Sequence, residues 1–477
     1  MWPITVLEVL FGGSMATLAV DILGRKSSFA RGYGAGLVAA GALAASLAAL
    51  VMDWGGSLGA TVALQPIADP LASLYVVDKL STFVGFTILL VGLVVSLYSM
   101  SYFRRTPPTP FYALFLVLVL SLIGVASAGD YLVLFLFWEG MSISAYGLVS
   151  SGRGQLTMEA SLKYFLMAGV GSLLALYGIA AIYFSTGSIQ LQSAAGLFVG
   201  GSTFSQLGLT LLIVGLGVEA AVVPLHTWLP DVYTASAIPV AAIVSGAVTG
   251  TGVFALVKVV QPIVVTNLGN AWDLQLFLGS LALVTMVIGN LSALAQGNLR
   301  RILSFSSIAQ TGYMLAALST LSAAGLVAVV FTIWNHGLLK SNFFMLIGKE
   351  NPSVQSSDLE NLRGLGRSDR RLGFMFASSS LGMMGAPPFG MFWSEILIIQ
   401  SLLAASSSFF ILLAAAVLLS IVMSIGYYFR VINTVVFGEP AQASPPRRPS
   451  DLAAPMVLLG LSLATGVLPF LILGRVL

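Results

Sequence analysis

The chain has 477 residues, of which only 8% are charged and 57% are hydrophobic, and its mean hydropathy is +0.97. A soluble domain carries roughly 25% charged residues, so this composition excludes a water-soluble enzyme and predicts an integral membrane protein. The sequence contains no cysteine and 2 histidines, which excludes disulfides, iron–sulfur clusters and thiolate metal sites on this chain. We therefore expect no metal and no cofactor on this chain, and the net charge of +3 gives no indication of a nucleic-acid partner.

A membrane-spanning helix needs about 20 mostly apolar residues. Fourteen segments fit this description, in chain order 4–23, 33–51, 80–100, 111–128, 131–149, 161–184, 206–225, 238–260, 274–294, 302–318, 325–347, 372–403, 409–437 and 452–473. The first segment has no basic region before it, so we expect a retained helix and not a cleaved signal. The predicted fold is an all-α integral membrane protein with 14 transmembrane helices surrounded by lipid.

The charges between these segments predict the orientation, because positive residues gather in cytoplasmic loops. The loops after odd-numbered segments hold Arg25, Lys26, Arg31, Arg104, Arg105, Arg153, Arg300, Arg301, Lys349, Arg363, Arg367, Arg370, Arg371, Arg447 and Arg448. The loops after even-numbered segments hold one basic residue and several acids, namely Lys79, Asp53, Asp69, Asp78 and Asp130. We expect a multi-pass protein of the cell (plasma) membrane with both termini on the outer side.

Prolines interrupt the seventh and twelfth segments. The seventh continues into PLHTWLP at 224–230, and the twelfth contains GAPPFG at 385–390. Proline removes a backbone donor and breaks a helix, and in lipid the freed carbonyls need protein or water partners. A single proline is often a packing kink, but broken helices at bilayer depth usually line a cavity or an ion path. Two interruptions favour the ion path, with Pro224, Pro387 and Pro388 as its helix breaks.

The separations of matching features indicate an internal repeat. Pro224 and Pro387 are 163 residues apart, and Lys163 and Lys340 are 177 residues apart. These similar offsets predict two five-helix repeats, which are inverted relative to each other because five is an odd number. We expect helices 1–3 in residues 1–110, the first repeat (helices 4–8) in 111–262, the second repeat (helices 9–13) in 263–437 and helix 14 in 438–477.

Ionisable side chains inside or beside the apolar segments form the candidate ion path. They are Glu139, Lys163, Glu219, His226, His336, Lys340 and Glu395. A charge at bilayer depth costs about 2.5–3.5 kcal/mol or more, and neighbouring carboxylates and cations control each other's protonation, so charge can move stepwise. The alternative is a set of buried ion pairs that lock helix packing. Of the remaining charges, Lys258 and Arg430 lie near segment ends and can snorkel, and Glu8 can cap a helix or contact a neighbouring subunit.

Six motifs resemble the antiporter-like subunits of complex I (NADH:quinone oxidoreductase), of energy-converting hydrogenases and of multisubunit Na⁺/H⁺ antiporters. They are FWEGMS at 137–142, LKYFL at 162–166, VPLHTWLPD at 223–231, NLRRILSFSS at 298–307, HGLLK at 336–340 and APPFG at 386–390. The resemblance covers about residues 69–395 and points to the N-, M- or antiporter D-type subunit. It implies proton translocation along a polar axis through the membrane centre. It also implies that Glu139 lies beside the path, that His226 flanks the first break, and that Lys340 and Glu395 belong to the second half-channel.

Two departures from the family concern the first half-channel. The family usually has a lysine at the position of Glu219, paired with the acid at Glu139, so here two acids would face each other and one would hold a proton. A second family lysine is absent between residues 239 and 257, and Gln310 stands where some relatives have a histidine. Three explanations remain open: Lys163 and His226 substitute for these cations, water carries the proton, or the first half-channel does not conduct.

The leading hypothesis is a non-catalytic subunit that translocates protons, or Na⁺, within a larger redox-driven or antiporter complex. The alternative is a structural subunit of such a complex that has lost conduction in its first half-channel. A lone solute transporter and a quinone-reducing enzyme are disfavoured, because polar sites are few and no flavin, nicotinamide or metal-cluster motif is present. We expect other membrane subunits and a peripheral redox arm as partners, and the sequence leaves the electron donor and the choice between H⁺ and Na⁺ open.

Overall fold

A computed structural model describes residues 2–24, 27, 30–57, 74–103, 107–108, 110–152, 154–192, 203–266, 271–348, 357–440 and 449–476. Part of the predicted charge asymmetry lies outside the described residues, namely Arg25, Lys26, Asp69, Arg104, Arg105, Arg153, Lys349, Arg447 and Arg448.

The described residues are almost entirely helical and include no β-strand, which confirms the all-α prediction. The helices are α1 (Trp2–Leu23), α2 (Ala35–Ser57), α4 (Lys79–Phe103), α5 (Phe111–Ser127), α6 (Tyr131–Ser150), α7 (Gln155–Thr186), α8 (Thr203–Gly217), α9 (Trp228–Ala235), α10 (Ile238–Ile243), α11 (Thr249–Thr266), α12 (Trp272–Ala295), α13 (Leu299–Leu318), α14 (Ala323–Ile347), α15 (Leu365–Ser368), α16 (Arg370–Met383), α17 (Gly390–Ala404), α18 (Ser408–Val431), α19 (Pro449–Val467) and α20 (Pro469–Val476). Short π-helical turns are η1 (Ala30–Gly34), η3 (Val244–Val248) and η4 (Ile432–Phe437).

Within the described part of the chain, 9 helical stretches are long and apolar enough to cross a membrane. The shorter apolar helices α5, α8, α17 and most of α19 fall on further predicted segments. The chain is therefore a multi-pass membrane protein, and the count of fourteen crossings stays a prediction.

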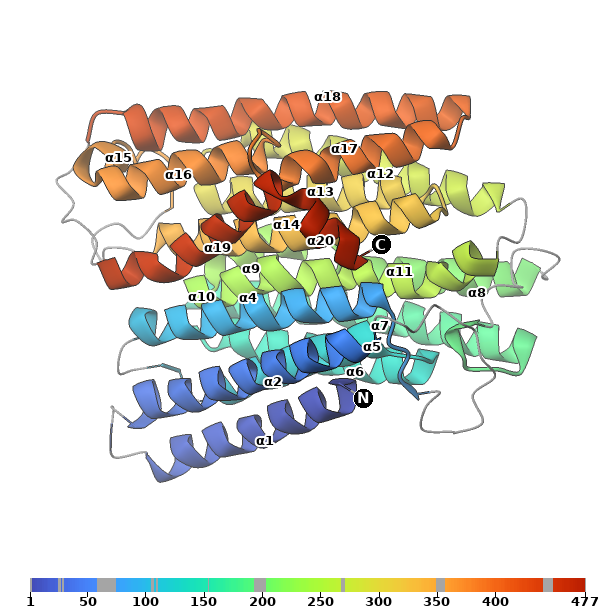
Figure 1. Ribbon diagram of the computed structural model, residues 1–477, viewed down its shortest axis with the longest axis horizontal. Coiled ribbons are helices and arrows are strands. Elements are labelled where there is room, and N and C mark those ends of the chain that lie inside the picture. Colours follow the sequence, from blue (N-terminus) through green and yellow to red (C-terminus); the bar gives the residue numbers. More distant parts are fainter. Residues whose placement is uncertain are drawn as a thin grey trace.

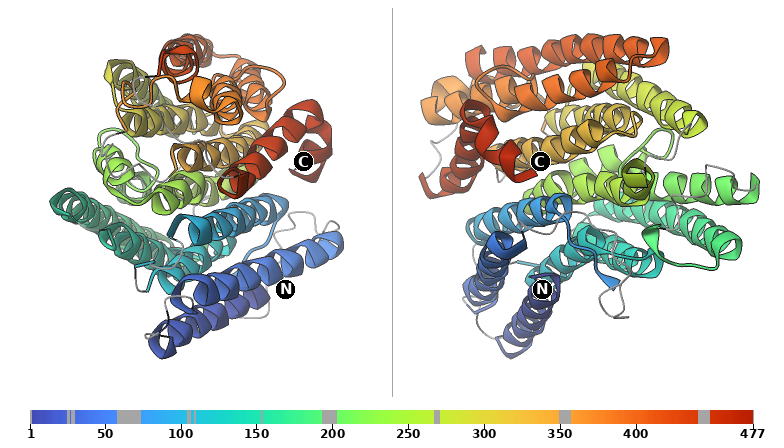
Figure 2. Two further views of the ribbon diagram at one scale, coloured as in Figure 1. Left: turned by 90° about the vertical axis from the view of Figure 1, so that its left-hand side faces the viewer. Right: turned by 45° about the vertical axis from the view of Figure 1, so that its right-hand side comes forward.

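The helices lie side by side, and the chain proceeds from α1 at one edge of the bundle to α18 at the other (Figure 1). Figure 2 shows that α19 returns from that edge to the middle of the bundle, where it packs on α14 and α4. The outer helices expose apolar side chains. Only 28% of the residues are buried in the most apolar 18-residue part of α1, and only 33% in that of α18. In contrast, all residues are buried in the most apolar 18-residue part of the α10–α11 stretch, and 89% are buried in that of α14. Polar groups on these two inner stretches are thus shielded from lipid.

Both predicted interruptions are present. At the first, α8 ends at Gly217 and α9 begins at Trp228. Two backbone groups of this interruption bond threonine hydroxyls of other helices. The Ala220 carbonyl accepts from Thr311 (2.9 Å), and the Val223 amide donates to Thr285 (3.2 Å). Because these two threonines belong to α13 and α12, the interruption is held by helices of the other half of the chain, as irregular backbone at membrane depth requires.

At the second interruption, α16 ends at Met383 and α17 begins at Gly390. Gly385 adopts a left-handed conformation there, with φ of 71°, which favours glycine. The peptide bonds Val223–Pro224 and Pro387–Pro388, one at each interruption, are cis.

Lys258 differs from its predicted placement. Its side chain is only 3% exposed and turns inward, where its ammonium lies 3.3 Å from the Val76 carbonyl oxygen and 3.4 Å from the Ser81 hydroxyl. The interpretation that Lys258 snorkels to the membrane surface was therefore wrong. The reason is that α11 is enclosed around Lys258, since residues 249–260 are all buried, so the lysine stem has no lipid-facing surface along which to extend.

Candidate functional site

Lys340 lies on the enclosed helix α14 and its side chain is fully buried. Its ammonium donates to the Leu303 carbonyl oxygen (2.6 Å), to the Ser306 hydroxyl and to the Tyr428 hydroxyl (3.3 Å). These acceptors come from α13 and α18. Among the described residues no carboxylate forms an ion pair with this ammonium. Its polar surroundings are therefore neutral oxygens, and the two hydroxyls among them can either accept or donate a hydrogen bond.

A cluster of neutral polar side chains continues from Lys340, and we call it the tyrosine cluster. Its members are Ser306, Tyr428, Tyr427, Asn290 and Tyr313, all buried. The hydroxyls of Ser306 and Tyr428 are 2.9 Å apart, and the rings of Tyr428 and Tyr427 pack with centroids 4.8 Å apart. The Tyr427 hydroxyl donates to the Asn290 amide oxygen (3.2 Å), and the Asn290 amide nitrogen donates to the Tyr313 hydroxyl (3.1 Å). The cluster joins α13, α18 and α12.

Glu395 lies at the far side of this cluster, on α17 just after the second interruption. It is 6% exposed, and Tyr313 and Tyr427 lie within electrostatic range of its carboxylate. The carboxylate rests against Gly385, and its Oε1 atom has no hydrogen-bond partner among the described residues. The tyrosine cluster therefore lies between Lys340 and Glu395, which are not separated by apolar side chains alone.

His336 lies one turn before Lys340 on the same face of α14, as their spacing predicts. It is 2% exposed, and its Nε2 atom has no partner within the described part of the chain. The neighbouring Asn335 donates to the Ser394 hydroxyl (3.0 Å). Since Ser394 precedes Glu395, this bond ties α14 to α17 beside the buried acid.

In the first half of the chain, Glu219 is fully buried where α8 has ended and the first interruption begins. Its Oε1 atom accepts from the Ser142 hydroxyl (2.9 Å) and from the Tyr164 hydroxyl (2.8 Å). Glu139, on α6, lies within electrostatic range of Glu219. The structure thus brings the two acids together, and in the described residues neither of them forms an ion pair.

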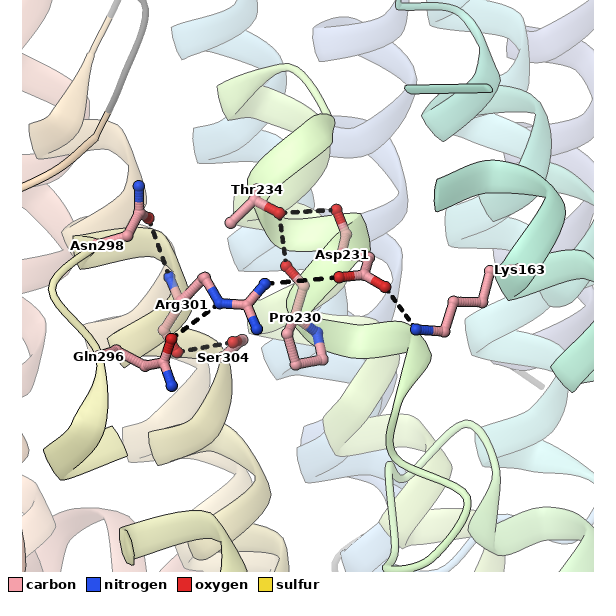
Figure 3. Close-up of polar contacts among 8 residues, drawn as sticks. All are labelled: Lys163, Pro230, Asp231, Thr234, Gln296, Asn298, Arg301 and Ser304. Atoms are coloured by element: carbon pink, nitrogen blue, oxygen red, sulfur yellow. Dashed lines mark hydrogen bonds and ion pairs between the residues drawn. The ribbon is translucent and has the colours of Figure 1, made fainter. Parts of the chain in front are cut away.

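Lys163 and His226 lie close to each other but are not the direct partners of these acids. The Lys163 ammonium binds the Asp231 Oδ2 atom (2.6 Å), with 41% of the lysine side chain exposed. The Asp231 Oδ1 atom is 3.7 Å from Arg301. Figure 3 shows Asp231 between Lys163 and Arg301. His226 is half-buried in the first interruption, where its Nδ1 atom has no partner in the residues that are described.

Polar groups also occupy the region between the two halves. The Tyr233 hydroxyl faces the hydroxyls of Ser245, Thr249 and Ser307. Ser307 donates to the Leu303 carbonyl oxygen (3.1 Å), which also accepts from Lys340. Buried polar groups therefore continue from α9 to the Lys340 site.

Sequence reasoning missed most of the neutral members of this site and two charged ones, Asp231 and Arg301. They are Ser142, Tyr164, Asp231, Tyr233, Asn290, Arg301, Ser306, Tyr313, Tyr427 and Tyr428. Polar side chains inside apolar segments are the signal that marks several of them, but the apolar segments contain many hydroxyls that bond only to their own helix, such as Thr87 and Ser127. Over the described ranges, no group of 3 or more His, Cys, Asp or Glu residues could hold a metal ion.

Comparison with known proteins places this arrangement in a family. The family described as "NADH:quinone oxidoreductase/Mrp antiporter, TM" matches residues 128–422. The chain is 34% identical to NADH-quinone oxidoreductase subunit 14 of Thermus thermophilus over 441 residues, which cover 91% of this chain and 92% of that protein.

Two solved structures share the fold. A chain of respiratory complex I from Thermus thermophilus with bound aureothin superposes with a TM-score of 0.81 at 30% identity, covering 98% of both chains. A chain of the membrane-bound sulfane sulfur reductase, an archaeal respiratory membrane complex, superposes with a TM-score of 0.88 at 26% identity, covering 99% of this chain and 96% of that one. The chain therefore belongs to the NADH:quinone oxidoreductase/Mrp antiporter transmembrane family.

Proposed function

We propose that this chain translocates protons across the membrane as a subunit of a multisubunit complex. The path runs along Glu139, Lys163, Glu219, His226, His336, Lys340 and Glu395. The observation that carries the proposal is the tyrosine cluster, because it offers hydroxyl and amide groups between a buried ammonium and a buried carboxylate. Charged groups inside a membrane are costly and are retained at ion pathways.

The chemistry of the cluster favours a proton over Na⁺. A hydroxyl can accept one hydrogen bond while it donates another, so the bonded hydroxyls of Ser306 and Tyr428 can pass a proton on from Lys340. The Tyr428 and Tyr427 rings pack without a bond between their hydroxyls, so the next transfer needs a movement of a ring or a bridging water. The Lys340 ammonium carries the proton at one end, and the Glu395 carboxylate receives it at the other. A Na⁺ ion at the cluster would instead meet the positive ammonium of Lys340 beside Ser306 and Tyr428.

Removal of the cluster hydroxyls tests this path. In Tyr427→Phe and Tyr428→Phe variants the rings keep their packing, but the hydroxyls are lost. The Tyr428 hydroxyl bonds the Lys340 ammonium, and a hydrogen bond to a charged group contributes about 1.5–3 kcal/mol, so we expect the initial rate of proton uptake in Tyr428→Phe to fall about tenfold or more. We expect the rate to fall in Tyr427→Phe as well, because the bond to Asn290 is lost. The rate is measured with a pH-sensitive dye in liposomes that contain the complex purified through this chain and driven by its own electron donor.

Tyr112→Phe is the matched control for those variants. Tyr112 lies on α5, away from the cluster; it is equally buried, and its hydroxyl accepts a hydrogen bond from Ser99 (3.2 Å). Its variant should translocate at the wild-type rate. Unchanged uptake in both Tyr427→Phe and Tyr428→Phe would exclude the tyrosine cluster as the path.

A second candidate function is a structural subunit whose first half does not conduct. It is favoured by Glu219, which stands where the family usually has a lysine. The Glu219 Oε1 atom accepts hydrogen bonds from the neutral Ser142 and Tyr164 hydroxyls and not from a cation. Glu139→Gln and Glu219→Gln distinguish the two. If both halves conduct, each variant lowers proton uptake, whereas a non-conducting first half leaves uptake unchanged while Lys340→Met still abolishes it.

The setting of this activity is also part of the proposal. The protein belongs to the cell (plasma) membrane with both termini outside, and helices 4–8 and 9–13 form inverted repeats, as the interruptions at Pro224 and Pro387 support. Other membrane subunits and a peripheral redox arm supply the driving reaction, so no cofactor is needed on this chain. A reporter fused after Leu477 tests the topology, because a cytoplasmic reporter would contradict it.

A further inference from the structure

The half-exposed cluster of Lys163, Asp231 and Arg301 lies where three helices meet. Lys163 belongs to α7, Asp231 to α9 and Arg301 to α13. Figure 3 shows the lysine and the arginine approaching the carboxylate from opposite sides. The two contacts are unequal, since Lys163 is 2.6 Å from one oxygen and Arg301 is 3.7 Å from the other.

Each cation of this cluster lies within two residues of a residue that bonds a buried ionisable group. Lys163 directly precedes Tyr164, whose hydroxyl donates to Glu219 (2.8 Å). Arg301 precedes Leu303 by two residues, and the Leu303 carbonyl accepts from Lys340 (2.6 Å). Asp231 therefore contacts both cations, Lys163 on the side of Glu219 and Arg301 on the side of Lys340.

Other contacts fix the helices around Asp231. The Arg300 guanidinium donates to the carbonyl oxygens of Thr234 (3.0 Å) and Ser236 (3.1 Å) at the end of α9. The Arg301 Nε atom donates to Gln296 (2.9 Å), which fixes its guanidinium beside Asp231 (Figure 3). These contacts join α9 to the first turn of α13, where Arg300 and Arg301 both lie.

The stability of these ion pairs does not explain their presence. The exposed fractions of the side chains are 41% for Lys163, 34% for Asp231 and 39% for Arg301. Ion pairs with this exposure contribute about 0–1 kcal/mol, so the fold does not depend on them. Coupling between two sites, in contrast, requires an element that both sites can bias.

We propose that Asp231 is a positioning residue that couples the two halves of the proton path. The inference rests on the proposed function. A change of charge at Glu219 weakens or strengthens the ion pair between Lys163 and Asp231. The Asp231 carboxylate then shifts toward or away from Arg301. This shift moves the first turn of α13 and with it the acceptors of Lys340. Because coupling is reciprocal, a change of charge at Lys340 also affects Glu219, through the same contacts in reverse order.

The test uses the complex that is purified through this chain, reconstituted in liposomes and driven by its own electron donor. Coupling free energies typically correspond to about 5–150-fold effects, so Asp231→Asn should lower the initial rate of proton uptake about fivefold or more. Asp231→Glu keeps the charge and should restore most of the rate. Glu360→Gln is the matched control, because it removes an exposed acid from the Arg363 ion pair (3.1 Å) and should change nothing.

Combined variants distinguish coupling from a purely structural role. Once Asp231→Asn has removed the shared carboxylate, Arg301→Gln should have no further effect on the rate, although it lowers the rate in the wild-type background. Independent, additive effects would overturn the inference. If Asp231→Asn fails to assemble, Arg301→Gln decides, since it removes the 3.7 Å contact with Asp231 while Asp231 keeps its pair with Lys163, and it should still lower the rate.

The outcomes separate this inference from the proposed function. Wild-type uptake in Asp231→Asn, together with loss of uptake in Lys340→Met, overturns the coupling role and leaves the proton path in place. Wild-type uptake in both variants overturns the proposed function itself.

Discussion

Replacing Lys340 with methionine should abolish proton uptake while the complex still assembles. Methionine fills the volume of the lysine stem with an apolar side chain, and the acceptors of Lys340 keep other partners, since Ser307 and Ser306 both donate to the Leu303 carbonyl. The helix therefore keeps its packing but loses the ammonium that carries the proton beside Ser306 and Tyr428. A positioned proton donor contributes about 10²–10⁴-fold to a transfer step, so the uptake rate should fall at least about a hundredfold.

The measurement is dye-detected proton uptake by reconstituted complex, with the amount of this chain in the complex determined beside it. Leu326→Met serves as the control, because it places a methionine at another buried position of α14. Full uptake in Lys340→Met would mean that no proton passes through this ammonium.

Replacing Gly385 with alanine should have the second large effect, on both assembly and uptake. A Cβ atom at this position would collide with the carboxylate of Glu395, and the φ of 71° is strained for any residue with a side chain. The strained backbone contributes about 1–3 kcal/mol of destabilisation, and the carboxylate must leave its place beside the tyrosine cluster. Uptake should therefore fall even in the fraction of the complex that assembles.

Gly41→Ala is the matched control for that substitution. Gly41 is exposed on α2, nothing lies within 4 Å of the position of its Cβ, and alanine favours a helix over glycine. Thermal unfolding and proton uptake are compared for the two variants. A Gly385→Ala protein that unfolds and translocates like the wild type would contradict the placement of Glu395 against the second interruption.

Much of the fold follows from local sequence physics. Apolar run length predicts the helices, and the prolines at 224 and 387 predict the two interruptions, because a missing backbone donor ends a helix wherever it occurs. The burial of Glu219 and Lys340 follows from their position inside apolar segments. The shared face of His336 and Lys340 follows from a spacing of four residues.

The partners of the charged groups could not be predicted in the same way. Lys163 binds Asp231, which is 68 residues away, and the tyrosine cluster draws on three helices. Contacts of this kind depend on how helices rotate against each other, and the sequence of one helix does not specify that rotation. Lys258 illustrates the same limit. A lysine near the end of an apolar segment is expected to extend to the membrane surface, but the sequence does not show that other helices enclose α11 around this residue.

The central claim is that a proton passes between Lys340 and Glu395, and infrared difference spectroscopy of the complex during turnover tests it most directly. The carboxyl band that disappears in Glu395→Gln identifies this acid. We predict that the band changes between protonated and ionised forms as electrons are supplied, and that Lys340→Met suppresses the change. A Glu395 band that stays constant while the wild-type complex translocates protons would contradict the account.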